Sequence, residues 1–243
     1  MLSSAGFYYR TTRDISHAPT FVLAGNAAGA TGIFNYNYAT QGVTYQDDDI
    51  LFGLFQTNNE TPPNTPAGWT WLTSYGDGTP GAVNSVALHM AWARASGTMN
   101  GGQPGFGDAG DHMYGRIYVI RGCRKRGAPV VVLNGTVGST STPMSFPVAD
   151  TPFEKCLVAH VGAHGRDAAS QWQNSTTSSS LESVTYPHTQ SGTSIGNGGG
   201  ISFAYGVKLT PGSLGSPTVD LINLTLPVVV ARATIAFIPR GAD

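Results

Sequence analysis

The sequence predicts an all-β protein, a jelly-roll-like antiparallel β-sandwich with an extended N-terminal arm, and three observations favour this class. Glycine and proline are abundant, with 32 and 15 residues in a chain of 243. Charged residues make up only 11% of the chain, whereas an ordinary soluble domain has about 25%. Short apolar runs recur between clusters rich in Gly, Pro and Asn, which is typical of strands joined by turns. A helical bundle is disfavoured, because its exposed faces need many Lys and Glu residues.

Nine apolar runs are expected to form the main strands. They lie at 20–24, 50–55, 69–75, 82–97, 113–120, 129–135, 156–163, 201–209 and 228–238. The run at 82–97 is the most helix-like of the nine. Within it, however, Val86, Leu88, Met90 and Trp92 alternate with small residues and His89, and an alternation of period two indicates a strand.

Some runs are apolar on both sides, for example those at 50–55 and 228–238. Such strands belong either to the centre of a covered sheet or to a sheet that a neighbouring subunit covers. The polar stretches at 98–112 and 171–199 are expected to be long, outward-facing loops, because they are rich in Gly, Ser and Thr.

Residues 1–46 are predicted to form an N-terminal arm or the first strands, and residues 47–243 the sandwich domain. The first segment has no basic start followed by an apolar stretch, so no secretion signal is expected. An arm rich in aromatic residues suits a subunit interface, and one or two core strands are the alternative. The candidate assembly contacts in this segment are Tyr8, Tyr9, Phe34, Tyr36 and Tyr38.

The basic cluster Arg124, Lys125 and Arg126 lies between two predicted strands. One interpretation of this cluster is a solvated loop. The other is a contact with an acidic patch on a neighbouring subunit, and on that interpretation the three residues are candidate assembly contacts. The acidic run 47–49 is expected to end a loop and to prevent edge pairing of the strand that follows it. Formal net charge is −1, so no nucleic-acid partner is expected.

Enzymatic and metal chemistry find little support in the residue pattern. His160 and His164 are four residues apart, but on a strand this spacing spans about 13 Å, too far for one ion. The serine-nucleophile pattern G-x-S-x-G is absent. Cys123 and Cys156 are predicted to be buried free thiols. No catalytic residue, metal ligand or cofactor is therefore assigned.

Six segments resemble a family of β-sandwich structural proteins of tailed bacteriophages, in which tail-associated and capsid-decorating members occur. The matching pieces are DDDILFGLF at 47–55, PAGWTWLT at 66–73, ALHMAWARASG at 87–97, GDHMYGRIYVIRGC at 110–123, CLVAHVGAHGRD at 156–167 and GGISFAYGVKLTPG at 199–212. The resemblance covers about residues 47–238. It implies a virion location and no reaction.

The sequence thus predicts a non-enzymatic structural subunit of a tailed-bacteriophage virion, assembled in the host cytoplasm. It would sit on the tail, as a fibre, tip or adhesion component, or decorate the capsid. Expected partners are other virion proteins and further copies of the chain, such as in a trimer. A carbohydrate-binding module for host-surface glycans is one alternative, with Trp172, Tyr186 and His188 as a candidate receptor loop. A sugar-cleaving enzyme is the other, and it needs two carboxylates about 5–10 Å apart.

Overall fold

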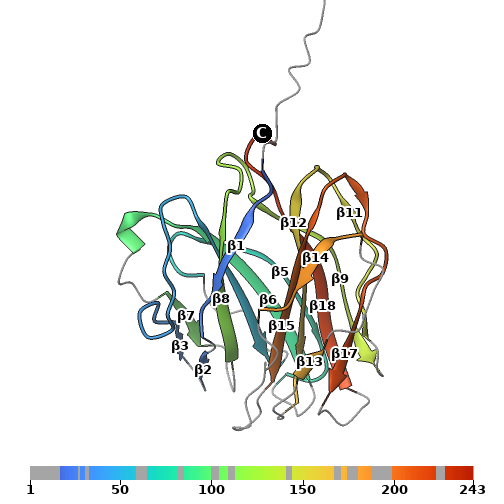
Figure 1. Cartoon of the computed structure of the whole chain (residues 1–243). Coiled ribbons are helices and arrows are strands. Elements are labelled where there is room, and N and C mark those ends of the chain that lie inside the picture. Colours follow the sequence, from blue (N-terminus) through green and yellow to red (C-terminus); the bar gives the residue numbers. More distant parts are fainter. Residues whose placement is uncertain are drawn as a thin grey trace, which may run out of the picture.

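A computed structural model shows two antiparallel sheets packed face to face in a sandwich-like arrangement (Figure 1). The structure describes residues 17–26, 28–30, 33–58, 65–80, 85–99, 104–108, 113–140, 144–166, 171–173, 180–187, 199–222 and 228–242. Within these ranges the only helical segment is the single 3-10 turn η1, Gly97–Met99, and no helix is long and apolar enough to cross a membrane.

The first sheet has the strand order β1-β8-β4-β6-β5. Its strands are β1 (Thr20–Ala24), β8 (Met113–Arg121), β4 (Ile50–Thr57), β6 (Val86–Arg94) and β5 (Trp69–Asp77), and β2 (Ala28–Ala30) extends it by pairing with β8. The second sheet has the order β14-β15-β12-β18-β9. Its strands are β14 (Glu182–Thr185), β15 (Gly200–Lys208), β12 (Cys156–His164), β18 (Val228–Phe237) and β9 (Val130–Thr140).

The two sheets come from the two halves of the chain. Every strand of the first sheet precedes residue 122, and every strand of the second follows residue 129, so the chain passes between the two sheets through segment 122–129. The strand order confirms an all-β sandwich but does not confirm jelly-roll connectivity. All nine predicted strands are present, with ends displaced by a few residues.

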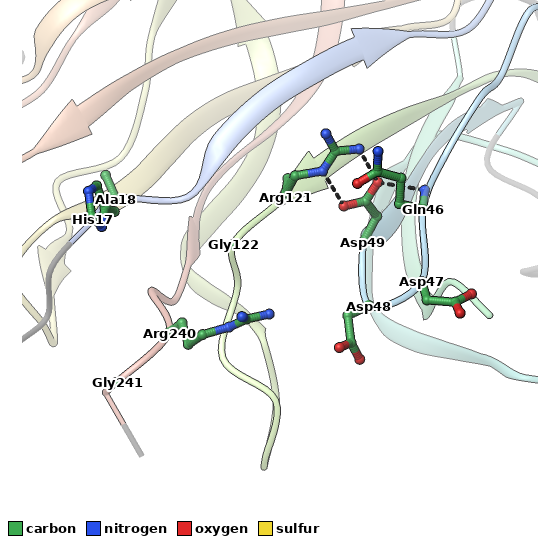
Figure 2. Close-up of a pocket in the computed structure, with 10 residues that line it drawn as sticks. All are labelled: His17, Ala18, Gln46, Asp47, Asp48, Asp49, Arg121, Gly122, Arg240 and Gly241. Carbon is green, nitrogen blue, oxygen red and sulfur yellow. Dashed lines mark hydrogen bonds and ion pairs between the residues drawn. The ribbon is translucent and has the colours of Figure 1, made fainter.

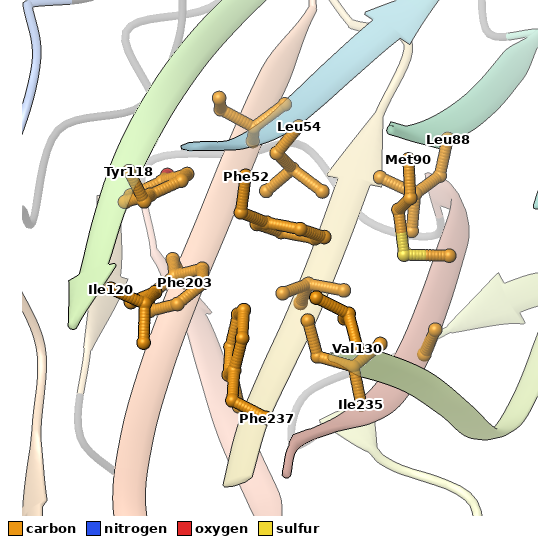
Figure 3. Close-up of a cluster of buried hydrophobic side chains, with 14 of the residues drawn as sticks. Phe52, Leu54, Leu88, Met90, Tyr118, Ile120, Val130, Phe203, Ile235 and Phe237 are labelled. Carbon is orange, nitrogen blue, oxygen red and sulfur yellow. The ribbon is translucent and has the colours of Figure 1, made fainter. Parts of the chain in front are cut away.

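The main core fills the space between the sheets (Figure 3). Phe52 and Leu54 of β4 face Phe203 of β15 and Phe237 of β18, and all four side chains are buried. Alternate residues of each strand point into this layer, as the period of a strand requires.

The outer face of the first sheet is covered by the same chain. Strand β3 (Ile33–Asn35) pairs with β7 (Gly105–Asp108), and the rings of Phe34, Tyr36 and Phe106 are buried against Phe55 and its neighbours. The described residues before position 47 thus include the three strands β1, β2 and β3.

This cover bears on two expectations. Phe34, Tyr36 and Tyr38 are at most 4% exposed, so their side chains pack within their own chain and leave little surface for the assembly contact that was expected of them. The segment 98–112 is not simply an outward loop, because it contains β7 with the fully buried Phe106.

Short strands also cover the outer face of the second sheet. They are β10 (Met144–Ser145), β17 (Thr218–Ile222), β13 (Gln171–Gln173), β11 (Asp150–Thr151) and β16 (Gly212–Ser213). Met144 and Phe146 pack on β18, and Ala149 and Leu214 pack on β12 and β18. The two-sided apolar strands are therefore covered within one chain.

The stretch 171–199 is not one long loop, since it supplies β13 and the edge strand β14.

The strands of both sheets end at the same two ends of the sandwich, as their register shows. Thr57 of β4 pairs with Met113, and His164 of β12 pairs with Gly200. Gly199, next to that pair, lies so close to the side chain of Gln56 that a Cβ would collide with it. These strand ends therefore share one end, called here the loop end. The opposite end, called the terminal end, holds segments 46–49, 122–129 and 238–242 (Figure 1).

Candidate functional site

A pocket of about 500 Å³ opens at the terminal end, and it is the candidate site that the described residues form most clearly (Figure 2). Four chain segments meet around it. They contribute His17 and Ala18, Gln46 to Asp49, Arg121 and Gly122, and Arg240 and Gly241. The pocket thus lies where the described chain begins and where it ends.

Asp49 anchors the pocket floor. Its carboxylate accepts two hydrogen bonds from the Arg121 guanidinium, from Nε to Oδ1 at 2.9 Å and from Nη2 to Oδ2 at 2.8 Å. The backbone N–H of Gln46 donates to the same carboxylate at 2.9 Å. Asp49 is 1% exposed, and a buried carboxylate is stable only when it is paired and hydrogen-bonded in this way.

Asp48 turns its side chain outward to Lys125 of the basic segment. Its backbone has φ of 72°, a left-handed conformation that Asp tolerates better than most residues. Lys125 forms an ion pair with it, and the hydrogen bond from Lys125 lowers the pKa of the Asp48 carboxyl group. Arg94 closes the corner by donating to the carbonyl oxygens of Asp48 and Arg124, at 3.3 and 2.6 Å.

The chemistry of these carboxylates is charge pairing. A sugar-cleaving enzyme needs one carboxyl group with a raised pKa as a proton donor, and Asp48 is shifted in the opposite direction. The acidic run also does not guard a sheet edge as expected, because β4 lies between β8 and β6. The described residues contain no group of three or more His, Cys, Asp or Glu side chains arranged to hold a metal ion.

The three basic candidates fall on the segment that connects the sheets. Arg124 is held by its own loop, since its Nε donates to the carbonyl of Ala128 at 2.7 Å and its guanidinium lies 5.9 Å from the ring centroid of Phe153. Lys125 pairs with Asp48, and Arg126 is exposed. Lys125 and Arg126 remain accessible to a partner.

The three receptor-loop candidates are placed only in part. Trp172 belongs to β13, which pairs with β17. Tyr186 is half-buried and packs against Met144, Phe146 and their neighbours. The side chain of Trp172, as well as His188, Tyr8 and Tyr9, lies outside the described residues.

The contacts of two buried histidines with hydroxyl groups were not predicted from the sequence. His89 of β6 is 1% exposed, and its ring nitrogens contact two hydroxyl groups, Nδ1 with Ser74 at 2.7 Å and Nε2 with Thr57 at 2.9 Å. His160 contacts Thr234 through Nδ1 at 3.0 Å. Cross-strand partners such as these are set by register, which no local sequence pattern encodes.

The prediction of buried free cysteines is confirmed. Cys123 and Cys156 are both unpaired and at most 1% exposed. Burial raises the pKa of the Cys123 thiol to about 12 and that of Cys156 to about 11. Both are thus held as thiols at neutral pH, the form with low reactivity.

These observations define the class of the protein. It is an all-β sandwich with a charged pocket beside both ends of its described chain. No family model matches the chain, and no curated protein or solved structure is significantly similar to it.

Replacing Asp49 by Ala is expected to lower the free energy of unfolding by about 2 kcal/mol. The change leaves the Arg121 guanidinium and the Gln46 N–H without their acceptor, and Arg121 recovers part of the loss by hydration because it is 43% exposed. Urea unfolding followed by fluorescence measures the difference. Asp47→Ala is the matched control, since Asp47 is exposed and a change below about 0.5 kcal/mol is expected. Equal losses in the two variants would contradict a structural role for the Asp49–Arg121 pair.

Proposed function

We propose that the chain is a non-enzymatic structural subunit of a tailed-bacteriophage particle. It would act on the tail, as a fibre, tip or adhesion component, or as a decoration of the capsid. The proposal rests on the sequence resemblance over residues 47–238 and on one structural observation. The two ends of the sandwich differ, because one holds the charged pocket and the other holds the ends of β4, β9 and β12.

The terminal end is suited to attachment. His17 and Gly241 both line its pocket, so the first and the last described stretches of the chain meet at this end. Lys125 and Arg126 are exposed there, on the segment that joins the two sheets. We assign the contact with other virion proteins to this end, and the fitting partner is an acidic surface.

The faces of the sandwich are less suited to assembly, because each sheet is covered by its own chain. Among the described residues, the exposed large apolar side chains are Val148, Val184 and Leu209. They lie on three separate segments, and scattered apolar side chains are normal on a protein surface. Contacts within a homo-oligomer would therefore use the terminal end and the edges.

The loop end is suited to an outward position. Strands β4, β9 and β12 end there, opposite the terminal end (Figure 1). A sheet with a continuous core holds the ends of its strands at fixed spacing, and loops that join such ends commonly carry binding residues. In this proposal the segment that carries Trp172, Tyr186 and His188 is the receptor candidate.

Immunogold labelling of purified phage particles with an antibody against this chain tests the proposal. The antibody is first shown to bind the recombinant chain, and particles incubated with antibody pre-absorbed on that chain are the control. Dense label on the head or on the tail is expected, and its position decides between decoration and adhesion. Particles that carry no label above the control overturn the assignment to the virion.

A further inference from the structure

A cradle of polar side chains surrounds Gly162 on the outer face of the second sheet. Gly162 lies in the middle of β12 and pairs with Ser202 of β15 on one side and with Arg232 of β18 on the other. His160 and His164 are its next neighbours on the same face of β12. With usual strand dimensions, the Cα atoms of His160, His164, Ser202 and Arg232 surround Gly162 over an area about 13 Å long and 10 Å wide, and Gly162 itself adds no side chain there.

The register and the packing both assign these side chains to the outer face. Residues Ala231 and Ala233 of β18 belong to the core between the sheets, so Arg232 and Thr234 point the other way. The contact of Thr234 with His160 at 3.0 Å agrees with this, as does the approach of the Phe146 ring to His160 with centroids 5.1 Å apart.

The cradle is polar and strongly desolvated. His160 is 3% exposed, His164 is fully buried and Ser202 is 6% exposed, while Arg232 is half-buried. Nδ1 of His160 contacts the Thr234 hydroxyl, and in the tautomer in which this hydroxyl donates, the neutral ring carries its proton on Nε2. This Nε2 is buried and has no hydrogen-bond partner.

Arg232 places an unpaired guanidinium nitrogen beside Gly162. Its Nε is buried without a hydrogen-bond partner, and no described carboxylate forms an ion pair with its guanidinium. Burial lowers the pKa of Arg232, and no neighbouring charge offsets this effect. A buried guanidinium N–H group without an acceptor is costly, so such a group normally has a hydrogen-bond partner.

We propose that the cradle around Gly162 binds an oxyanion, with the Arg232 guanidinium and the His160 ring as the donors. Carboxylate, sulfate and phosphate groups share the required chemistry, since each presents two or more oxygens that a planar guanidinium can bind through two parallel hydrogen bonds. The anion can come from a free inorganic ion or from an acidic sugar of a surface glycan. This inference does not depend on the virion assignment.

Isothermal titration calorimetry on the full chain tests the proposal. Sodium sulfate and 3′-sialyllactose are the two probes, and sodium chloride at matched ionic strength is the blank. Binding of at least one probe is expected for the wild type, with at least tenfold weaker binding in Arg232→Gln. Arg126→Gln, which removes an exposed cation that lines neither the cradle nor the pocket at the terminal end, is the matched control and should bind as the wild type does.

The outcomes separate the sources of the anion. Tighter binding of the sialylated sugar than of sulfate supports the cradle as a glycan subsite, and equal or weaker binding supports a site for a free ion. Arg232→Lys keeps the charge but loses the planar fork, so intermediate affinity is expected. Melting curves establish that each variant is folded. No binding of either probe, or equal binding in Arg232→Gln, overturns the proposal.

Discussion

Acidification from pH 7 to about pH 4 is expected to remove most of the folding stability of this protein. Three buried histidines, His89, His160 and His164, have a pKa lowered from 6.5 to about 4 because burial disfavours the charged ring. The folded pKa lies below the unfolded one, so the unfolded chain binds more protons between these values. Stability is therefore complete above about pH 6.5 and falls as the pH drops toward 4.

The expected size of this effect is large. A shift from 6.5 to about 4 corresponds to about 3 kcal/mol for each histidine, and a domain has only about 5–15 kcal/mol in total. Urea unfolding at pH 7, 6, 5 and 4.5 measures the decline. His160→Gln should make the pH dependence less steep, because one of the three buried rings is then missing. An unfolding free energy that is equal at pH 7 and pH 4.5 contradicts this interpretation of the buried rings.

Replacing Phe52 by Ala is expected to lower the free energy of unfolding by about 4 kcal/mol. The ring is fully buried between the two sheets, and its centroid lies 5.4 Å from that of Phe237 and 6.2 Å from that of Phe203 (Figure 3). The change removes the burial of a large ring and leaves a cavity between closely packed sheets, and Phe→Ala substitutions in cores cost about 3–5 kcal/mol.

Urea unfolding of the Phe52→Ala variant at pH 7 measures this effect. Phe52→Leu, which fills most of the cavity, should lose clearly less, and Val148→Ala at a 56% exposed position should change stability by less than about 0.5 kcal/mol. A loss in Phe52→Ala as small as that in Val148→Ala would mean that the two sheets do not pack through this ring.

The main strands were predictable because their evidence is local. In β6, Leu88 and Met90 alternate with Ala87 and Ala91, and that alternation alone separates a strand from a helix. Strands β7 and β13 were missed because each is only three or four residues long. They form through pairing with β3 and β17, which are distant in sequence, and not through a periodic pattern of their own.

The candidate site was predictable only as separate pieces. Asp49 and Arg121 are both visible as charged residues beside apolar runs, but they are 72 positions apart. Their pairing follows from the adjacency of β4 and β8. The cradle is hidden in the same way, since His160 and Arg232 become neighbours only when β12 and β18 align.

The sequence by itself determined the all-β class, the positions of nine strands and the burial of both cysteines. These properties depend on composition and on the two-residue period of apolar side chains, which act over a few neighbouring residues. Tertiary structure alone decided that Phe34, Tyr36 and Tyr38 cover a sheet of their own chain. It also decided which charges are paired, because register brings distant residues together and burial then selects the partners that satisfy one another.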